Sequence, residues 1–570
     1  MSATAAGASR RARFGRAARR AATPRYVAAI AALLALAALL FGPPGGDAAA
    51  HLYQTQVWRE HGWQLWDNLW YGGRYSQVNY SLVYYPLSAL FGTVFVVSAS
   101  AGVAAGAFSR LMHMRWPHLA PVPSLAAALG LTFGVLAGTY PFLLGFAVAL
   151  VALVCAATGR LWTAAALTLL TTLSHPLALV FLVIVLASFA VTTPGWWRPA
   201  APRWFAAAVV AVMGLQALLM RAFDSEGATY PFDPKDAIAI AAFCIAGMLL
   251  ARGLPDQRAI FALFAAYALL AGAAFVISSP MGGNVVRLLL LMGAPLLLIP
   301  IAARGFRPRA AVIACLAGAL LWQGLPALAG WRTANTARAA DESFWLPAIA
   351  FLEQHSDPGH RVEVVATADN WEAYYLARRG VPLARGWFRQ DDFPTNRPLY
   401  NRLTARTYQG WMRRTGIRYV LLPDDPLDYT ARNEADLLRS GRSGLSLVAD
   451  LGAWTVYELP DATPIVTPKR SARVLRLTSS RLLIDVDRPG TYRVRVRYTP
   501  YWRITGGGPG ACAAPLAPWG TQLRVRRAGV VRLDFDPGIR SVVKSVLGDE
   551  GGCALTPAKR APLTIVKPLS

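Results

Sequence analysis

The chain of 570 residues contains only 15% charged residues but 55% hydrophobic ones, and its mean hydropathy is +0.36. Soluble domains contain about a quarter charged residues, so this apolar excess does not fit one soluble core. The composition excludes an intrinsically disordered chain, a disulfide-dense mini-scaffold and a compact cytosolic enzyme. We expect a polytopic α-helical membrane protein with a substantial polar appendage.

The net charge of +26 is carried mainly by Arg, since only five Lys occur. A pI near 10.5 is also typical of proteins that bind nucleic acid. However, seven of the Arg lie in residues 1–25, where there is no acidic residue. Arg in that position indicates a cytoplasmic N-terminus and attraction to anionic lipids. We therefore expect the lipid bilayer, and no nucleic acid, as a partner.

Apolar segments follow one another through the first part of the chain, and a helix needs about 20 apolar residues to cross a bilayer. Eleven segments qualify if 161–174 and 176–193 are counted separately. Fusing those two would put several Arg of the inner loops outside, against the positive-inside rule. The predicted spans are 25–42, 82–108, 119–137, 140–158, 161–174, 176–193, 203–221, 236–251, 259–278, 285–303 and 309–327.

The first span also resembles part of a cleavable signal peptide, because Arg-rich and apolar stretches precede Asp47-Ala48-Ala49-Ala50. A polytopic chain needs only a signal anchor at this point, and we interpret the segment in that way. The expected organisation is a basic cytoplasmic N-terminus at 1–24 and a transmembrane domain at 25–327. The transmembrane domain includes a large first outer loop at 43–81.

An odd number of spans places the rest of the chain outside the cytoplasm. Residues 341–465 read as a mixed α/β domain, with strand candidates at 361–365 and 419–422. Residues 466–570 read as a small β-sandwich, since much of this stretch alternates with a period of two. Cys512 and Cys553 lie in this part and pair if it faces an oxidising compartment.

The first outer loop holds the most unusual combination of residues. Asp47 and His51 are four residues apart, so a helix would put both on one face. An N-cap role would explain Asp47 alone. The loop also contains Trp66, Arg74 and Tyr75, whose rings and guanidinium suit the binding of a sugar or a lipid. An interfacial aromatic belt is the alternative.

A carboxylate at this place suits two kinds of chemistry. Asp47 would act as a general base on an acceptor hydroxyl, or it would bind Mg²⁺ or Mn²⁺ that neutralises a phosphate leaving group. His51 would orient the acid or join the phosphate site.

Polar residues beside apolar spans are costly and need a reason. Arg287 opens the tenth span after Asn284, and we interpret both as ligands of a donor phosphate, together with His175. An ion pair between Arg287 and Asp47, or snorkelling of Arg287, is the alternative. For His175, an ordinary packing role also stays open. Asp233 is a candidate second acid, with a solvated loop charge as its alternative.

The α/β domain concentrates Trp, Arg and acids in two stretches. Trp371 and Glu372 form one pair, and Arg385 and Trp387 form the other. Such residues bind carbohydrate by stacking and bidentate hydrogen bonds, although they also occur at seams between domains. The sequence contains no Walker loop, no dinucleotide-binding Gly fingerprint after a strand, and no HExxH.

These motifs together resemble a known family. The stretches Asn370-Trp371-Glu372, Ala384-Arg385-Gly386-Trp387 and Tyr419 to Asp424, with Glu363, are similar to an uncharacterised family of actinobacterial polytopic membrane proteins. Gly46-Asp47 with His51, Gly145-Phe146, Ser174-His175-Pro176 and Asn284 with Arg287 fit the same family. That family resembles the GT-C glycosyltransferase superfamily, whose members use polyprenyl-phosphate sugars and carry an essential acid in the first outer loop.

The resemblance implies an inverting membrane glycosyltransferase with Asp47 as its catalytic acid. It would transfer a sugar from a lipid-linked donor to a cell-envelope glycan or glycolipid, outside the bacterial plasma membrane. The superfamily often has two adjacent acids or Asp-x-Asp, whereas three Ala follow Asp47 here, so metal dependence stays open. A transporter or flippase of lipid-linked precursors and a non-catalytic envelope assembly protein are the alternatives.

Overall fold

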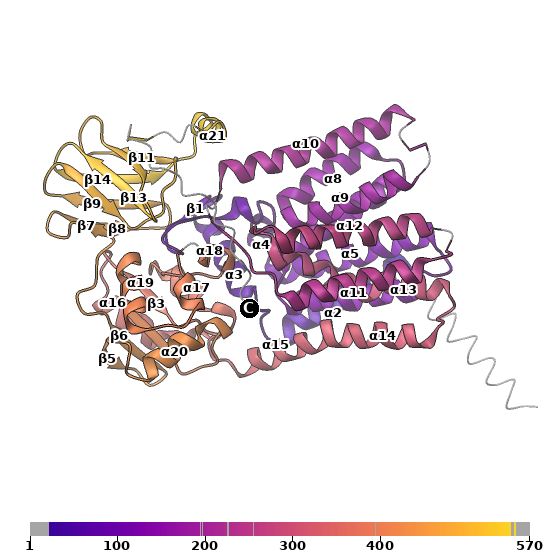
Figure 1. Ribbon diagram of the computed structural model, residues 1–570, viewed down its shortest axis with the longest axis horizontal. Helices are drawn as coiled ribbons and strands as arrows, with labels where there is room; N and C mark the ends of the chain where they lie inside the picture. The colour runs from indigo at the N-terminus through magenta and orange to yellow at the C-terminus, as the bar shows by residue number, and fades with distance from the viewer. Residues whose placement is uncertain are drawn as a thin grey trace, which may run out of the picture.

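The computed structural model describes residues 22–193, 195–196, 198–224, 227–254, 256–393, 395–548 and 552–553. Residues 1–21 of the expected basic N-terminus and the end of the expected sandwich from residue 554 lie outside these ranges. A bundle of long helices occupies one end of the molecule, and two parts that contain β-sheet occupy the other (Figure 1). Segments of the first loop lie between them.

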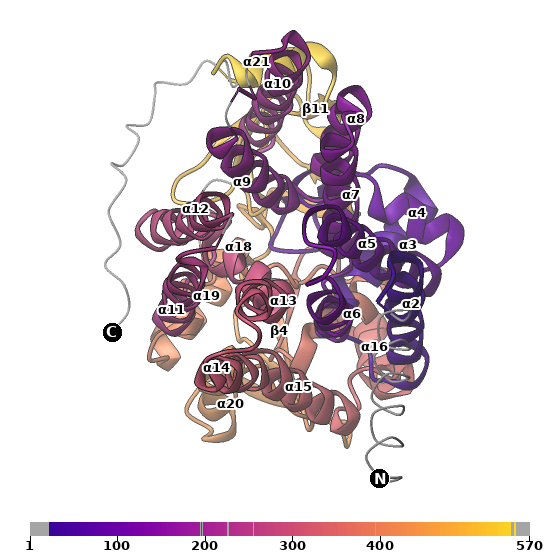
Figure 2. The same ribbon diagram turned by 90° about the vertical axis from the view of Figure 1, so that its right-hand side faces the viewer.

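Eight helices of the described residues are long and apolar enough to cross a membrane. Three shorter apolar helices accompany them: α6 (Pro121–Leu136), α8 (Leu161–Ser174) and α9 (Pro176–Thr192). Figure 2 shows the helices of the bundle packed side by side. The eight long ones are α2 (Pro24–Phe41), α5 (Thr93–Arg115), α7 (Tyr140–Ala157), α10 (Ala200–Ala222), α11 (Pro234–Ala251), α12 (Gln257–Val276), α13 (Arg287–Ala303) with the turn before it, and the segment Arg309–Thr336 that contains α14 (Arg309–Ala319) and α15 (Leu325–Thr336).

The three shorter helices lie at the remaining predicted spans, and α6 and α8 end at the first loop. The carbonyl of Ala137, just after α6, accepts from the backbone N–H of Asp47 at 3.2 Å. The carbonyl of Leu173 in α8 accepts from Leu82 at 2.9 Å. At the other end of the bundle, Trp116 after α5 donates its Nε1–H to Asp256 before α12, at 2.7 Å. The count of eleven spans stays a prediction that this arrangement favours.

The predicted span 82–108 is wrong in its bounds. The structure divides it into α4 (Tyr84–Phe91) and α5, with Gly92 between them at a φ of 85°. Such a backbone conformation favours Gly and ends a helix. Apolar composition alone did not separate the two helices, and the first loop therefore extends beyond residue 81.

One of the two parts that contain β-sheet, the α/β part, is built on a four-stranded mixed sheet of order β3-β4-β6-β5. Strand β3 runs parallel to β4, and Val362 lies opposite Tyr419, whereas the other pairs are antiparallel. The elements are α16 (Glu342–His355), β3 (Arg361–Val364), α17 (Glu372–Tyr375), α18 (Arg389–Asp392), α19 (Ala405–Thr415), β4 (Ile417–Pro423), α20 (Arg432–Arg439), β5 (Ser446–Asp450) and β6 (Trp454–Glu458).

The other part, the sandwich, consists of two antiparallel four-stranded sheets, β12-β13-β10-β7 and β11-β14-β9-β8. Inward residues of both sheets, such as Leu482, Val494 and Leu523, share one buried core. Cys512 and Cys553 form a disulfide in this part. The elements are β7 (Val466–Thr467), β8 (Ala472–Leu477), β9 (Arg481–Val486), β10 (Gly490–Val494), β11 (Trp502–Thr505), β12 (Cys512–Pro515), β13 (Thr521–Val525), β14 (Gly529–Phe535) and α21 (Ile539–Val546).

The first loop joins all three parts of the molecule. It contains α3 (Ala48–His61) and the short hairpin of β1 (Trp66–Asp67) and β2 (Arg74–Tyr75). Its backbone accepts from Leu383 of the α/β part at Leu69, and from Arg497 of the sandwich at Gly72, both at 2.7 Å. The loop is therefore held on both sides, and the start of α3 has a fixed position at the end of the bundle next to these two parts.

Candidate active site

Asp47 occupies the N-cap position of α3, but its side chain makes no capping hydrogen bond. The turn between α6 and α7 packs closely against the backbone of Asp47. A Cβ on Gly138 in this turn, whose φ is 80°, would lie 2.5 Å from the Asp47 nitrogen. The N-cap alternative thus explains where Asp47 lies and not what its carboxylate does. That carboxylate is instead available to groups outside the helix.

Arg287 is the nearest cation to Asp47 among the described ion pairs. Its Nη2 lies 3.7 Å from Asp47 Oδ2, and both side chains are largely buried. The guanidinium also lies over the ring of Phe142, 5.7 Å from its centre. Burial raises the pKa of Asp47 to about 6, although Arg287 acts in the opposite direction. The site therefore holds a carboxylate that exchanges its proton near neutral pH.

His51 lies one turn into α3 and is almost fully buried. Rings of Tyr80, Tyr84, Tyr85 and Tyr140 surround it at centre-to-centre distances of 5.5 to 6.2 Å. Tyr85 Oη is 3.5 Å from Nδ1, and Nε2 has no hydrogen-bond partner among the described residues. Burial, with help from the positive charge of Arg287, lowers the pKa of His51 to about 3. The imidazole is therefore neutral.

The structure brings His175 into the same cluster. Its Nδ1 accepts from the backbone N–H of Leu177 and so caps α9, whereas Nε2 has no partner within the described chain. Tyr80 lies between the two histidines, with ring centres 5.0 Å from His175 and 5.5 Å from His51. His175 therefore has both a packing role and a free ring nitrogen beside the site.

Asn284 lies in the turn just before α13, and it is half-buried. This turn packs closely against the loop before α11. The approach is so close that a Cβ on Gly282 would lie 1.9 Å from the carbonyl oxygen of Tyr230. The glycine is thus required for the approach that sets the start of α13. Arg287 thus reaches Asp47 directly after this tightly packed turn, which also carries Asn284.

Two groups of the α/β part reach the same place. Trp387 donates its Nε1–H to the carbonyl of Gly46 at 3.3 Å, and its ring centre is 6.2 Å from that of His51. Asp369 Oδ1 lies 3.2 Å from the position of a Cβ on Gly46. Asp369 raises the pKa of Asp47, whereas Arg389 lowers it, so both lie within electrostatic reach. Burial raises the pKa of Asp369 itself to about 6.

Asp369 and its neighbour have an unusual backbone. The φ angles of Asp369 and Asn370 are 65° and 54°, which non-glycine residues rarely adopt. Such strain persists where the surrounding structure imposes it and often marks a functional site. Asp369 and Tyr80 were not among the residues predicted from the sequence. The local signal for Asp369 was its position directly before the stretch Asn370-Trp371-Glu372.

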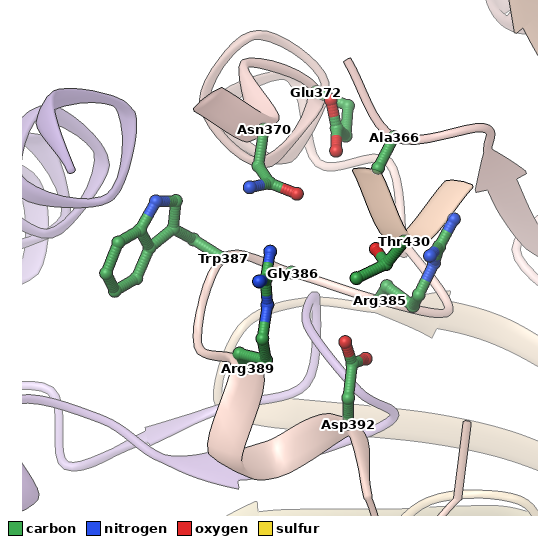
Figure 3. Close-up of a pocket in the computed structure, with 9 residues that line it drawn as sticks. All are labelled: Ala366, Asn370, Glu372, Arg385, Gly386, Trp387, Arg389, Asp392 and Thr430. Carbon is green, nitrogen blue, oxygen red and sulfur yellow. The ribbon is translucent and has the colours of Figure 1, made fainter. Parts of the chain in front are cut away.

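A small pocket of the α/β part lies next to Trp387 (Figure 3). Asn370, Arg389 and Asp392 point toward its middle, whereas the indole of Trp387 is turned toward a helix of the N-terminal part. In this structure its free space is about that of one water molecule. Arg389 is paired with Asp428, and Asp392 accepts from Asn396 and Tyr400. The lining residues are Ala366, Asn370, Glu372, Arg385, Gly386, Trp387, Arg389, Asp392 and Thr430.

Two expected substrate ligands at this pocket already have protein partners. Glu372 Oε2 accepts from Thr367 Oγ1 at 2.7 Å, and burial raises the pKa of Glu372 to about 7. Arg385 is paired with Glu363 and Glu434, and all three side chains are buried. Both groups line the pocket, but much of their bonding capacity holds the fold together.

Other expected site residues lie outside this cluster, and all of them except the exposed Asp233 are in buried packing. Trp66 stacks on Phe535 at 5.6 Å, and Tyr75 bonds Thr499 at 2.9 Å, so both belong to the core shared with the sandwich. The remaining three are also accounted for by protein contacts: Arg74 pairs with Asp391 at 2.7 Å, Trp371 packs on Tyr375, and Asp233 caps α11 by accepting from Lys235.

The residues near Asp47 do not form a complete set of protein ligands for Mg²⁺ or Mn²⁺. Among the described residues, no group of three or more His, Cys, Asp or Glu side chains could hold a metal ion. Asp47 is paired with Arg287, and Asp369 is the second carboxylate nearby. Arg287 supplies positive charge at the place where a cation would otherwise be needed. No step below therefore passes through a metal.

No protein-family model and no curated protein matches the chain. Among solved structures, it is similar to the arabinofuranosyltransferase AftD from Mycobacteria, with a TM-score of 0.44 and 14% identity. The match covers 82% of this chain and 41% of that one. The chain is also similar to the oligosaccharyltransferase AglB from Archaeoglobus fulgidus, solved with an inhibitory peptide and a dolichol-phosphate. There the TM-score is 0.36 and the identity 12%, over 70% of this chain and 69% of the other.

Both of these proteins are glycosyltransferases, the class that the sequence resemblance names. All these scores are below 0.5, so the likeness is distant. The chain spans about two fifths of the length of AftD.

Proposed function

We propose that this protein is a membrane glycosyltransferase that uses a lipid-linked sugar phosphate on the outer face of the plasma membrane. The acceptor is a glycan or glycolipid of the cell envelope. One observation carries the proposal: Asp47, Arg287 and His51 meet at the outer end of the bundle, directly beneath the pocket of the α/β part. A lipid tail can lie among the spans while its headgroup reaches this cluster.

Asp47 acts as the general base in this proposal. It takes the proton of an acceptor hydroxyl while the hydroxyl oxygen attacks the anomeric carbon of the donor sugar. The bond between that carbon and the phosphate oxygen breaks, and the lipid phosphate leaves with the electron pair. A direct displacement of this kind inverts the anomeric carbon. A pKa of about 6 suits the task, since a base works best when its pKa lies near the operating pH.

Arg287 stabilises the leaving phosphate. Its contact with Asp47 is long enough, at 3.7 Å, that its N–H groups can turn to phosphate oxygens, which a guanidinium binds in a bidentate way. Neutral His51 and His175 each have an unpartnered ring nitrogen in the described structure. Either nitrogen can donate to the phosphate in the tautomer that carries its proton there. Asn284 adds an amide on the same side.

In this proposal the acceptor binds at the pocket of the α/β part, which has to widen to admit a sugar. Trp387 forms the edge between this pocket and His51, and indole rings stack well on the apolar faces of sugars. Asn370 and Arg389 provide hydrogen-bond donors. Asp369 acts through Asp47, because its charge raises the pKa of that residue, and is therefore a positioning residue.

The decisive experiment replaces Asp47 by Asn in protein reconstituted into vesicles with a polyprenyl-phosphate sugar and an envelope glycan. Loss of the general base should lower transfer by about 10²–10⁴-fold, while donor binding and thermal unfolding change little. Asp485→Asn is the matched control, because Asp485 pairs with Arg473 on the surface of the sandwich. Transfer at the parental rate in the Asp47 variant would overturn the proposal.

A further inference from the structure

Helix α21 lies across the outer end of α10 in both views (Figures 1 and 2). Arg221 in the last turn of α10 donates its Nε–H to the carbonyl of Val546 at 3.3 Å. Tyr501 of the sandwich donates to the carbonyl of Ala222 at 2.6 Å. Because α10 is a candidate membrane span, these contacts place α21 at the level where that span leaves the bilayer.

The apolar side chains of α21 fall into two groups. Val542 and Val546 pack against the core of the sandwich. Ile539, Val543 and Leu547 follow at a spacing of four residues, so they share one side of the helix. Their side chains are exposed by 86%, 52% and 78%. The described part of the chain therefore leaves a stripe of three large apolar residues open.

Positive charge borders this stripe. Arg540 and Lys544 each directly follow a residue of the stripe, and both are exposed. Residues Ile539–Val546 include no acidic residue. An apolar stripe bordered by cations is typical of a helix that lies in a membrane interface. Anionic headgroups are the chemistry that complements those cations.

We propose that α21 is an interfacial helix that inserts Ile539, Val543 and Leu547 into the outer leaflet. Arg540 and Lys544 lie at the level of the phosphates of anionic lipids. The helix thereby ties the sandwich to the bilayer beside α10, in addition to the connection through the spans. This assignment does not depend on the proposed transferase activity.

A fluorescent label at position 543 tests the proposal in the full chain. Cys155, Cys244 and Cys315 are replaced by Ala, and Val543→Cys carries an environment-sensitive dye in vesicles with acyl-chain spin labels. Val530→Cys is the matched control, because Val530 is the same residue type with a similar exposure of 50%. It lies at the start of β14, whereas the other end of that strand packs on Trp66 of the first loop.

We expect acyl-chain quenching at position 543 to be at least about twofold stronger than at position 530. The difference should grow when phosphatidylglycerol is added, and the double variant Arg540→Gln, Lys544→Gln should lose that dependence. Equal quenching at the two positions would overturn the proposal. Blue-shifted emission at 543 without acyl-chain quenching would also overturn it, because protein such as residues 554–570 would then cover the stripe.

Discussion

Asp47 lies between charges of both signs, and these charges set when it can act as a base. Burial raises its pKa to about 6; Arg287 and Arg389 work against this rise, and Asp369 adds to it. The base is the ionised carboxylate, which is the dominant form above its pKa. Transfer should therefore rise with pH through about 6 and level off at higher pH.

Two variants should move this pH dependence in opposite directions. Asp369→Asn removes a negative charge, so the pKa of Asp47 falls and activity persists to lower pH. Arg287→Gln removes a positive charge, so the pKa rises and the residual activity needs higher pH. The measurement is kcat/KM against pH for each variant in vesicles. A profile for Asp369→Asn that coincides with the parent would show that Asp369 has no influence on the base.

The sequence predicts Asp47, His51, His175 and Arg287 as site residues, and the structure places these four residues close together. Arg287 and His175 stand out as polar residues beside apolar spans, whereas Asp47 and His51 stand out by their spacing in the first loop. The sequence was not sufficient to predict Asp369. That residue follows an ordinary strand of a separate domain, and only the docking of this domain on Gly46 brings it to Asp47. Trp66 and Tyr75 were predicted to bind substrate, but they pack in the core shared with the sandwich. The sequence alone does not distinguish an aromatic residue that binds sugar from one that packs against a neighbouring domain.

At the scale of elements, one buried ion pair connects the first loop to the segment that carries Trp387 and Arg389. Arg74 of β2 and Asp391 of α18 are 2.7 Å apart, and their side chains are only 3% and 2% exposed. Arg74 also lies over the ring of Phe388, 3.9 Å from its centre. The pair therefore holds α18 against the loop whose helix α3 begins at Asp47.

Removing one partner of this pair should be costly. Arg74→Gln leaves the Asp391 carboxylate buried without its cation, which typically lowers the free energy of unfolding by about 3–5 kcal/mol. Arg473→Gln is the control, because its ion pair with Asp485 is exposed and should be worth at most about 1 kcal/mol. Thermal unfolding in lipid nanodiscs measures both. Similar losses of stability in the two variants would contradict the structural role given to Arg74.

Most elements follow from local patterns in the sequence. The strands at 361–365 and 419–422 and the separate helices on either side of His175 are present in the structure. Pro176 has no N–H to continue a helix, so the boundary between α8 and α9 could be predicted. The division of 82–108 into α4 and α5 could not be predicted, because Gly92 lies inside an unbroken apolar run and Gly is common in membrane helices.

At the scale of the whole molecule, the candidate site forms only where the bundle, the first loop and the α/β part meet. Arg287 comes from the bundle and Asp47 from the first loop, whereas Trp387 and Asp369 come from the α/β part. The proposed reaction therefore requires the α/β part to lie outside the cytoplasm, on the side where the first loop emerges. An odd number of spans satisfies this requirement if the N-terminus is cytoplasmic.

Cysteine labelling of intact cells tests this topology and the separation of α8 from α9. In a chain with Cys155, Cys244 and Cys315 replaced by Ala, Thr158→Cys and Ala201→Cys lie before α8 and in α10. Eleven spans place both positions inside, so a membrane-impermeant maleimide should label neither until the cells are permeabilised. Val530→Cys in the sandwich should react from outside at once.

If α8 and α9 formed a single span, positions 158 and 201 would lie on opposite sides, and one of them would react in intact cells. That outcome would also reverse the side of every later loop relative to the N-terminus. Asp47 and the α/β part would then face opposite compartments, which their contact at Gly46 does not allow.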